Sequence, residues 1–160
     1  MCRYPIEFAA ASSSLEIFKL LLERGAKLDG TYCLHAAAGG QGRGEPIKIM
    51  EYLINERDFD VNEIEFVHEK KIMPEEWKDR RYGTPLHYAA AWGFEDRFEY
   101  LLSKGADPQI EGVYYKDGSR WGTALDWQKT NREGNGYWSP RILELLGERP
   151  STDDIAEDRQ

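Results

Sequence analysis

Residues 82–90 read Tyr82-Gly83-Thr84-Pro85-Leu86-His87-Tyr88-Ala89-Ala90, and degraded copies of this segment recur along the chain. One copy is Trp121-Gly122-Thr123-Ala124-Leu125-Asp126-Trp127, and an earlier one is Tyr32-Cys33-Leu34-His35-Ala36-Ala37-Ala38. A fourth is Pro5-Ile6-Glu7-Phe8-Ala9-Ala10, in which Glu7 stands where the histidine falls. A second apolar stretch comes after every copy, so the sequence predicts a pair of short helices in each.

Residues with special backbone preferences mark the expected helix ends. Thr84-Pro85 and Ser139-Pro140 are typical helix starts, because the hydroxyl can cap free N–H groups and proline suits the first helical position. Gly25 and Gly105 fall where a helix ends in a left-handed residue. None of these helices is long enough to bury its apolar face alone, so the pairs are expected to stack.

The run from Gly83 to Ala90, followed by Leu101-Leu102-Ser103-Lys104-Gly105-Ala106-Asp107, resembles an ankyrin repeat. The resemblance implies an all-α solenoid of stacked helix pairs with β-hairpin or loop fingers. We expect a repeat domain over residues 1–147 and an acidic, disordered tail over 148–160. The expected units cover residues 4–29, 32–62, 82–109 and 121–147, with an insertion at 63–82. The first and fourth units are atypical, as terminal caps that face water should be.

Loops are expected to absorb the irregular spacing between units. The glycine-rich segment 39–44 is interpreted as a flexible link between two helices, and residues 131–139 as a similar loop in the fourth unit. Asp117-Gly118 between two β-prone runs predicts a hairpin finger. The insertion 63–82 is interpreted first as a solvated excursion and second as a partner contact. It is a candidate for a larger finger, with a helical turn beginning at Pro74.

No constellation of residues indicates an enzyme, a metal site or a cofactor. The resemblance implies structural roles for His35 and His87, which bind the helix start and the adjoining loop, while His68 is expected to be exposed. Cys33 beside His35 lacks the paired spacing that a zinc site needs. The remaining structural positions of the motif are Thr84, Pro85, Leu86 and Gly105.

Aromatic residues are the candidates for partner contact. In ankyrin repeats the residue after the motif histidine points toward the concave groove, and here that column is Phe8, Ala36, Tyr88 and Trp127. Trp92 lies four residues after Tyr88 and shares its helix face. A second hypothesis is that these rings pack on one another and support the inserted loops. The predicted partner-binding residues are Tyr88, Trp92, Trp127, Tyr114, Tyr115, Trp121 and Trp77.

Composition narrows the function classes. A net charge of -8 argues against nucleic-acid binding, and no apolar run is long enough for a membrane span. Two cysteines give no disulfide framework, so a reducing compartment, cytoplasm or nucleus, is expected. The resemblance implies a non-catalytic, monomeric module that binds a partner protein through its concave face and fingers. The alternative is a substrate-recruiting adaptor or chaperone-like subunit of a ubiquitin or proteasome-type assembly.

Overall fold

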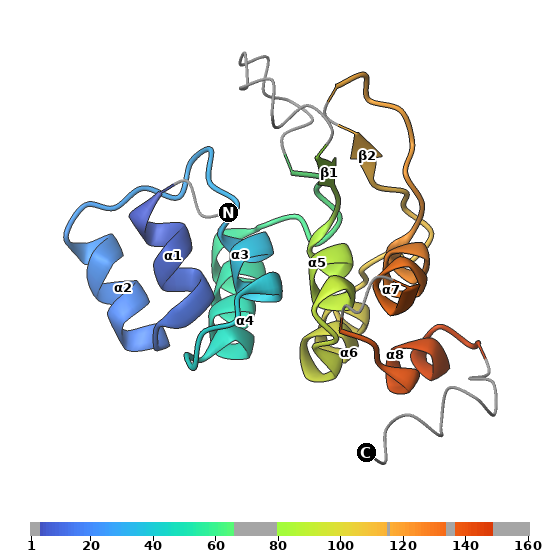
Figure 1. The fold of residues 1–160 in the computed structure, drawn as a ribbon. Helices are drawn as coiled ribbons and strands as arrows, with labels where there is room; N and C mark the ends of the chain where they lie inside the picture. Colours follow the sequence, from blue (N-terminus) through green and yellow to red (C-terminus); the bar gives the residue numbers. More distant parts are fainter. Residues whose placement is uncertain (1–3, 66–79, 115, 134–136, 149–160) are drawn as a thin grey trace.

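The computed structural model describes residues 4–65, 80–114, 116–133 and 137–148 (Figure 1). Its helices are arranged in consecutive pairs: α1 (Pro5–Ser12) with α2 (Leu15–Glu23), α3 (Cys33–Gly39) with α4 (Pro46–Arg57), α5 (Pro85–Ala91) with α6 (Glu95–Ser103), and α7 (Ala124–Glu133) with α8 (Pro140–Leu145). The mostly helical fold predicted from the repeats is therefore confirmed.

The pairs stack in chain order, as Figure 1 shows. The first helices form one row, in which α1 packs on α3, α3 on α5 and α5 on α7. The second helices form another row from α2 to α8. Alanine pairs let the first helices approach closely, since both members of each pair are at most 4% exposed: Ala9, Ala10, Ala37, Ala38, Ala89 and Ala90. Phe18 of α2 and Phe98 of α6 belong to the hydrophobic core, and neither is exposed to solvent.

The predicted helix ends are present. The Ser139 side chain accepts a hydrogen bond from the Ile142 N–H at 3.3 Å and caps α8. Thr84 is the extended residue that precedes Pro85 at the start of α5. Gly25 and Gly105 have φ angles of +94° and +87° after α2 and α6. This left-handed conformation is cheap only for glycine, so the residue type sets where each helix stops.

A small sheet joins the fingers of the third and fourth units. The predicted hairpin around Asp117-Gly118 is confirmed, because the Tyr114 N–H donates to the Ser119 carbonyl at 2.9 Å. Strand β2 (Val113–Tyr114) of this hairpin also pairs antiparallel with β1 (Arg81–Tyr82). The β1–β2 pairing was not predicted, because it unites strands that are far apart in the sequence.

The glycine-rich segment 39–44 is packed and not a free link, so its interpretation as a flexible connection is wrong. A Cβ atom on Gly40 would lie 2.5 Å from the carbonyl oxygen of Ala11. Arg97 of α6 adds a second restraint, because its guanidinium donates to the Gly40 carbonyl at 2.6 Å and to the Ala37 carbonyl at 3.0 Å. These contacts hold the end of α3 between the first and third units.

Helix α7 extends to Glu133, further than the loop predicted for residues 131–139 allows. Gln128 of this helix is fully buried and binds backbone groups of two neighbouring segments. Its amide donates to the carbonyls of Ala90 and Tyr137, and its oxygen accepts from the Ser139 N–H at 3.0 Å. Gln128 therefore supports the link to α8, although it replaces the small alanine of the motif.

The predicted insertion is described only at its ends, where the Glu65 N–H donates to the Gly83 carbonyl at 3.3 Å. The predicted helical turn from Pro74, the exposure of His68 and the disordered tail lie outside the described residues, except for the tail's first residue, Glu148, which is exposed.

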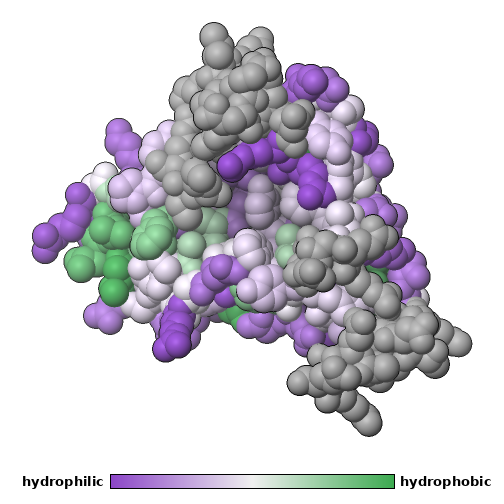
Figure 2. Space-filling model, in the orientation of Figure 1, coloured by the Kyte–Doolittle hydropathy of each residue, from purple (hydrophilic) through white to green (hydrophobic). Residues whose placement is uncertain are grey.

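Apolar side chains gather on the surface over α1 and α2 (Figure 2). Phe8, Ile17 and Leu20 are 66%, 51% and 46% exposed. These apolar side chains lie on the same unit as the exposed Glu16 and Glu23, so its outer surface is mixed in character. Among the described residues, every helix is too short or too polar to cross a bilayer.

Candidate functional site

The motif histidines are held by backbone groups. Nδ1 of His87 accepts a hydrogen bond from the Thr84 N–H at 3.1 Å, so Nε2 carries the proton that it donates to the Gly122 carbonyl at 3.3 Å. Nε2 of His35 donates to the Glu63 carbonyl at 2.9 Å. Burial lowers the pKa of both imidazoles to about 4. Both rings are therefore neutral at physiological pH and tie one unit to the next.

Acids take over the histidine position in the outer units. The Glu7 carboxylate accepts from the Tyr4 N–H at 3.2 Å and from the Tyr32 N–H at 2.8 Å. Asp126 accepts from the Thr123 N–H at 2.7 Å. These roles were not predicted, although the alignment of the four copies placed both acids in the histidine column.

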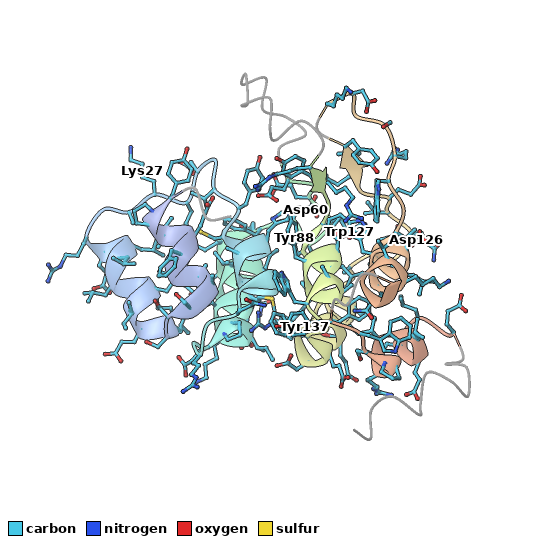
Figure 3. The ribbon with its side chains drawn as sticks, in the orientation of Figure 1. Lys27, Asp60, Tyr88, Asp126, Trp127 and Tyr137 are labelled. Carbon is cyan, nitrogen blue, oxygen red and sulfur yellow. The ribbon has the colours of Figure 1, made fainter. Side chains whose placement is uncertain are left out.

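Most of the predicted aromatic residues form one ladder of edge-to-face contacts. The ring centre of Tyr88 lies 5.8 Å from that of His35 and also 5.8 Å from that of Trp127. Trp121 continues it at 5.7 Å from Trp127, and Tyr114 lies 6.3 Å beyond Trp121. Figure 3 shows Tyr88 and Trp127 next to each other, on α5 and α7. The ladder links the row of first helices to the fingers.

Solvent reaches these rings unequally. Trp127 is 8% exposed, whereas Tyr88 and Trp121 on either side of it in the ladder are half-buried. The exposed Arg81 covers one face of Trp121, with its guanidinium carbon 3.8 Å from the ring centre. Tyr115 and Trp77 lie outside the described residues. Trp127 therefore fits the packing hypothesis better than the contact hypothesis.

Trp92 is not part of this ladder, but it lines the same hollow as Tyr88. Its ring packs against Tyr137 at 5.4 Å, and a Cβ on Gly39 would lie 3.4 Å from its indole. Trp92 and Tyr88 together line a hollow of about 230 Å³, which we call the inner pocket. Its other walls come from α1, α3 and the segment before β1: Glu7, Ala11, Tyr32, His35, Ala36, Gly39, Gly40 and Glu65.

Glu65 joins the insertion to the inner pocket. The Tyr88 hydroxyl donates a hydrogen bond to its carboxylate, and Glu65 is 7% exposed. Burial and the adjacent Glu65 charge raise the pKa of the Tyr88 phenol well above its usual value. Tyr88 therefore stays protonated and acts as a donor. Nothing in the local sequence marks Glu65, because the contact depends on how the insertion leaves α4.

A second, larger hollow of about 750 Å³ runs between the loops after α2 and α4, and we call it the finger groove. Its lining residues are Leu28, Asp29, Gly30, Thr31, Tyr32, Arg57, Asp58, Phe59, Asp60, Asn62, Glu63 and Ile64. Figure 3 places Asp60 on the finger side of Tyr88. No group of three or more histidines, cysteines or acids within the described part of the chain could hold a metal ion.

Comparison with known protein families matches this chain to ankyrin repeats. The family model described as "Ankyrin repeats (3 copies)" matches residues 6–111, which include the first three helix pairs except for Pro5. A search of curated proteins finds no match for this chain.

Proposed function

The chain belongs to the ankyrin-repeat family, and on that basis we propose that it is a non-catalytic module that binds a partner protein. The partner lies on the face formed by the first helices and reaches the fingers. Ankyrin repeats generally serve as protein-interaction modules, and the motif histidines here are neutral and bound to the backbone. We place the module in the cytoplasm or nucleus, as its low cysteine content suggests.

One observation carries this proposal: Tyr88 and Trp92 line an open pocket beside a buried packing layer. Tyrosine and tryptophan contribute most of the binding energy at many protein interfaces, above all in pockets that exclude water. The adjoining Trp127 serves as support, because little of its ring is accessible. We therefore expect partner contact at Tyr88 and Trp92, and beyond them at Trp121 on the finger.

The test is capture of partner proteins from cells by the tagged chain, compared with Trp92→Ala. Tyr100→Ala is the matched control, because it removes another half-buried ring, from the second row of helices. We expect Trp92→Ala to lose at least about tenfold of the captured partner, as hot-spot residues do, while Tyr100→Ala retains it.

Far-UV circular dichroism checks that both variants keep their helices. Equal capture by the wild type and Trp92→Ala would contradict the proposal, and so would unfolding of Trp92→Ala alone, which would assign the ring to the core. Ubiquitin or proteasome subunits among the captured proteins would favour the adaptor alternative.

A further inference from the structure

The finger groove and the inner pocket have one lining residue in common. Tyr32 lines both hollows, and its ring packs edge-to-face on His35 at 5.4 Å. Tyr32 is 9% exposed, and Glu7 accepts a hydrogen bond from its N–H, so the wall between the hollows is held in place. The two hollows therefore adjoin at Tyr32, and a long side chain from an extended chain in the groove can reach over this residue into the pocket.

Acidic side chains dominate the lining of the finger groove. Asp29, Asp58, Asp60 and Glu63 line it, with Arg57 as the single cationic residue among the lining residues. Arg57 is turned onto Tyr52 of α4, where its Nε donates to the phenol oxygen at 2.9 Å.

Between these charges the groove offers apolar surface from Leu28, Phe59 and Ile64. A ligand that fits this surface combines positive charges with apolar side chains.

The inner pocket also combines acidic lining residues with apolar and aromatic surface. Its charged lining residues are Glu7 and Glu65, and His35 is neutral. The rings of Tyr88 and Trp92 complete the walls, and aromatic faces attract cations, more strongly where water is excluded. Arg80 also acts on this region, because its charge opposes the rise in the Tyr88 pKa. A volume of about 230 Å³ is sufficient for one long side chain.

We propose that the finger groove and the adjoining inner pocket together form one site for an extended segment of the partner that is rich in lysine or arginine. One cationic side chain of that segment enters the inner pocket beside Tyr88 and Trp92. The inference rests on the proposed partner-binding function and adds the chemistry of the partner. The net charge of -8 favours the same class of partner and disfavours nucleic acid, whose phosphates the acids repel.

The probe is a fluorescein-labelled peptide of alternating lysine and leucine with glycine ends. Two matched peptides carry glutamate or glutamine in place of lysine. Fluorescence anisotropy with the full chain measures the dissociation constants at low and high salt. We expect the lysine peptide to bind, the glutamine peptide to bind at least about tenfold more weakly, and salt to weaken the lysine complex.

Variants that replace an acidic side chain by its amide test whether the peptide binds in the finger groove. Asp29→Asn with Asp58→Asn removes two groove charges and should weaken the lysine peptide about threefold to tenfold. Glu16→Gln with Glu148→Gln is the control, because it changes the net charge equally at exposed residues outside both hollows. Trp92→Ala should weaken the lysine peptide by about tenfold through the inner pocket.

Equal binding of the lysine and glutamate peptides would overturn the inference, as would equal losses in the two charge variants. If the lysine peptide fails to bind while Trp92→Ala still loses the cellular partner, the proposed function stands and the basic segment is wrong. If Trp92→Ala retains both the peptide and the cellular partner, the partner-binding role of the pocket fails as well.

Discussion

The Glu7 carboxylate accepts a hydrogen bond from the backbone N–H of Tyr32 at 2.8 Å and so joins the first unit to the start of the second. His87 does the same for the later units, because its Nε2 donates to the Gly122 carbonyl. Glutamate and histidine at the same motif position thus both provide a hydrogen-bond partner for a backbone group at the junction between two units.

Replacing Glu7 by alanine should lower the free energy of unfolding by about 2 kcal/mol or more, because the N–H groups of Tyr4 and Tyr32 both lose a charged acceptor. Glu7→Gln should cost less, since one carbonyl oxygen remains. Urea denaturation measures both values. The exposed Glu16→Ala, within about 0.5 kcal/mol of wild type, is the control. A Glu7→Ala loss no greater than that of the control would contradict the bridging role.

Acid should destabilise the protein through His35 and His87. Burial lowers the pKa of each from 6.5 to about 4. Between these two pH values the imidazoles are protonated in the unfolded chain but neutral in the folded chain, so acid favours unfolding. The stabilisation is complete above pH 6.5 and is lost as the pH falls toward about 4. Between about pH 7.5 and about pH 5.5, each histidine should remove about 1.4 kcal/mol of the unfolding free energy.

His87→Asn tests this dependence, because the asparagine oxygen can still accept from the Thr84 N–H while the titrating ring is gone. The variant should be less stable at neutral pH but lose about half as much stability on acidification as the wild type. Unfolding by urea at several pH values measures both quantities. An unchanged pH slope in the variant would show that His87 does not titrate as its burial implies.

Gly40→Ala should destabilise the protein by about 1–3 kcal/mol, because the added methyl group would press on the Ala11 backbone. The Gly40 backbone is extended, with φ of -72° and ψ of 134°, so any residue can adopt it and only the close approach is tested. Gln41→Ala is the control at the exposed neighbour and should leave the thermal midpoint nearly unchanged. A neutral Gly40→Ala would indicate that the segment 39–44 moves freely.

Arg97→Met should cost about 2–4 kcal/mol, because the carbonyls at the end of α3 lose their guanidinium donor while the apolar stem is kept. Arg141→Met is the control: Arg141 pairs with Glu99 at 3.7 Å and Glu144 at 3.1 Å on the exposed surface, where such pairs contribute little. Calorimetric unfolding of the two variants measures the difference. Similar midpoints for both would contradict a structural role for Arg97.

The helix pairs could be predicted because their determinants are local. Thr84-Pro85 and Ser139-Pro140 start helices and Gly105 ends one through backbone preferences that each segment carries alone. The Asp117-Gly118 hairpin could be predicted for the same reason. The recurrence of these signals was sufficient to identify the stack and the family.

The candidate site could be predicted only in part. Tyr88 and Trp92 were identified from their helix positions, and they do line the inner pocket. Trp127 occupies the same motif column but is nearly buried, because the fingers and Arg81 close over the ladder. The solvent exposure of such a ring depends on neighbours from other units, so it cannot be predicted from the position of the residue in the motif.

Local sequence signals therefore specified the four helix pairs and most of their ends, although α7 runs further than these signals indicated. Three contacts between units became visible only in the folded chain: Glu7 with Tyr32, Glu65 with Tyr88, and Arg97 with the end of α3. The difference lies in how far apart in the sequence the interacting residues are. Helix ends and turns are set by a few consecutive residues, whereas a hollow lined by Tyr32 and Tyr88 exists only after stacked units bring distant segments together.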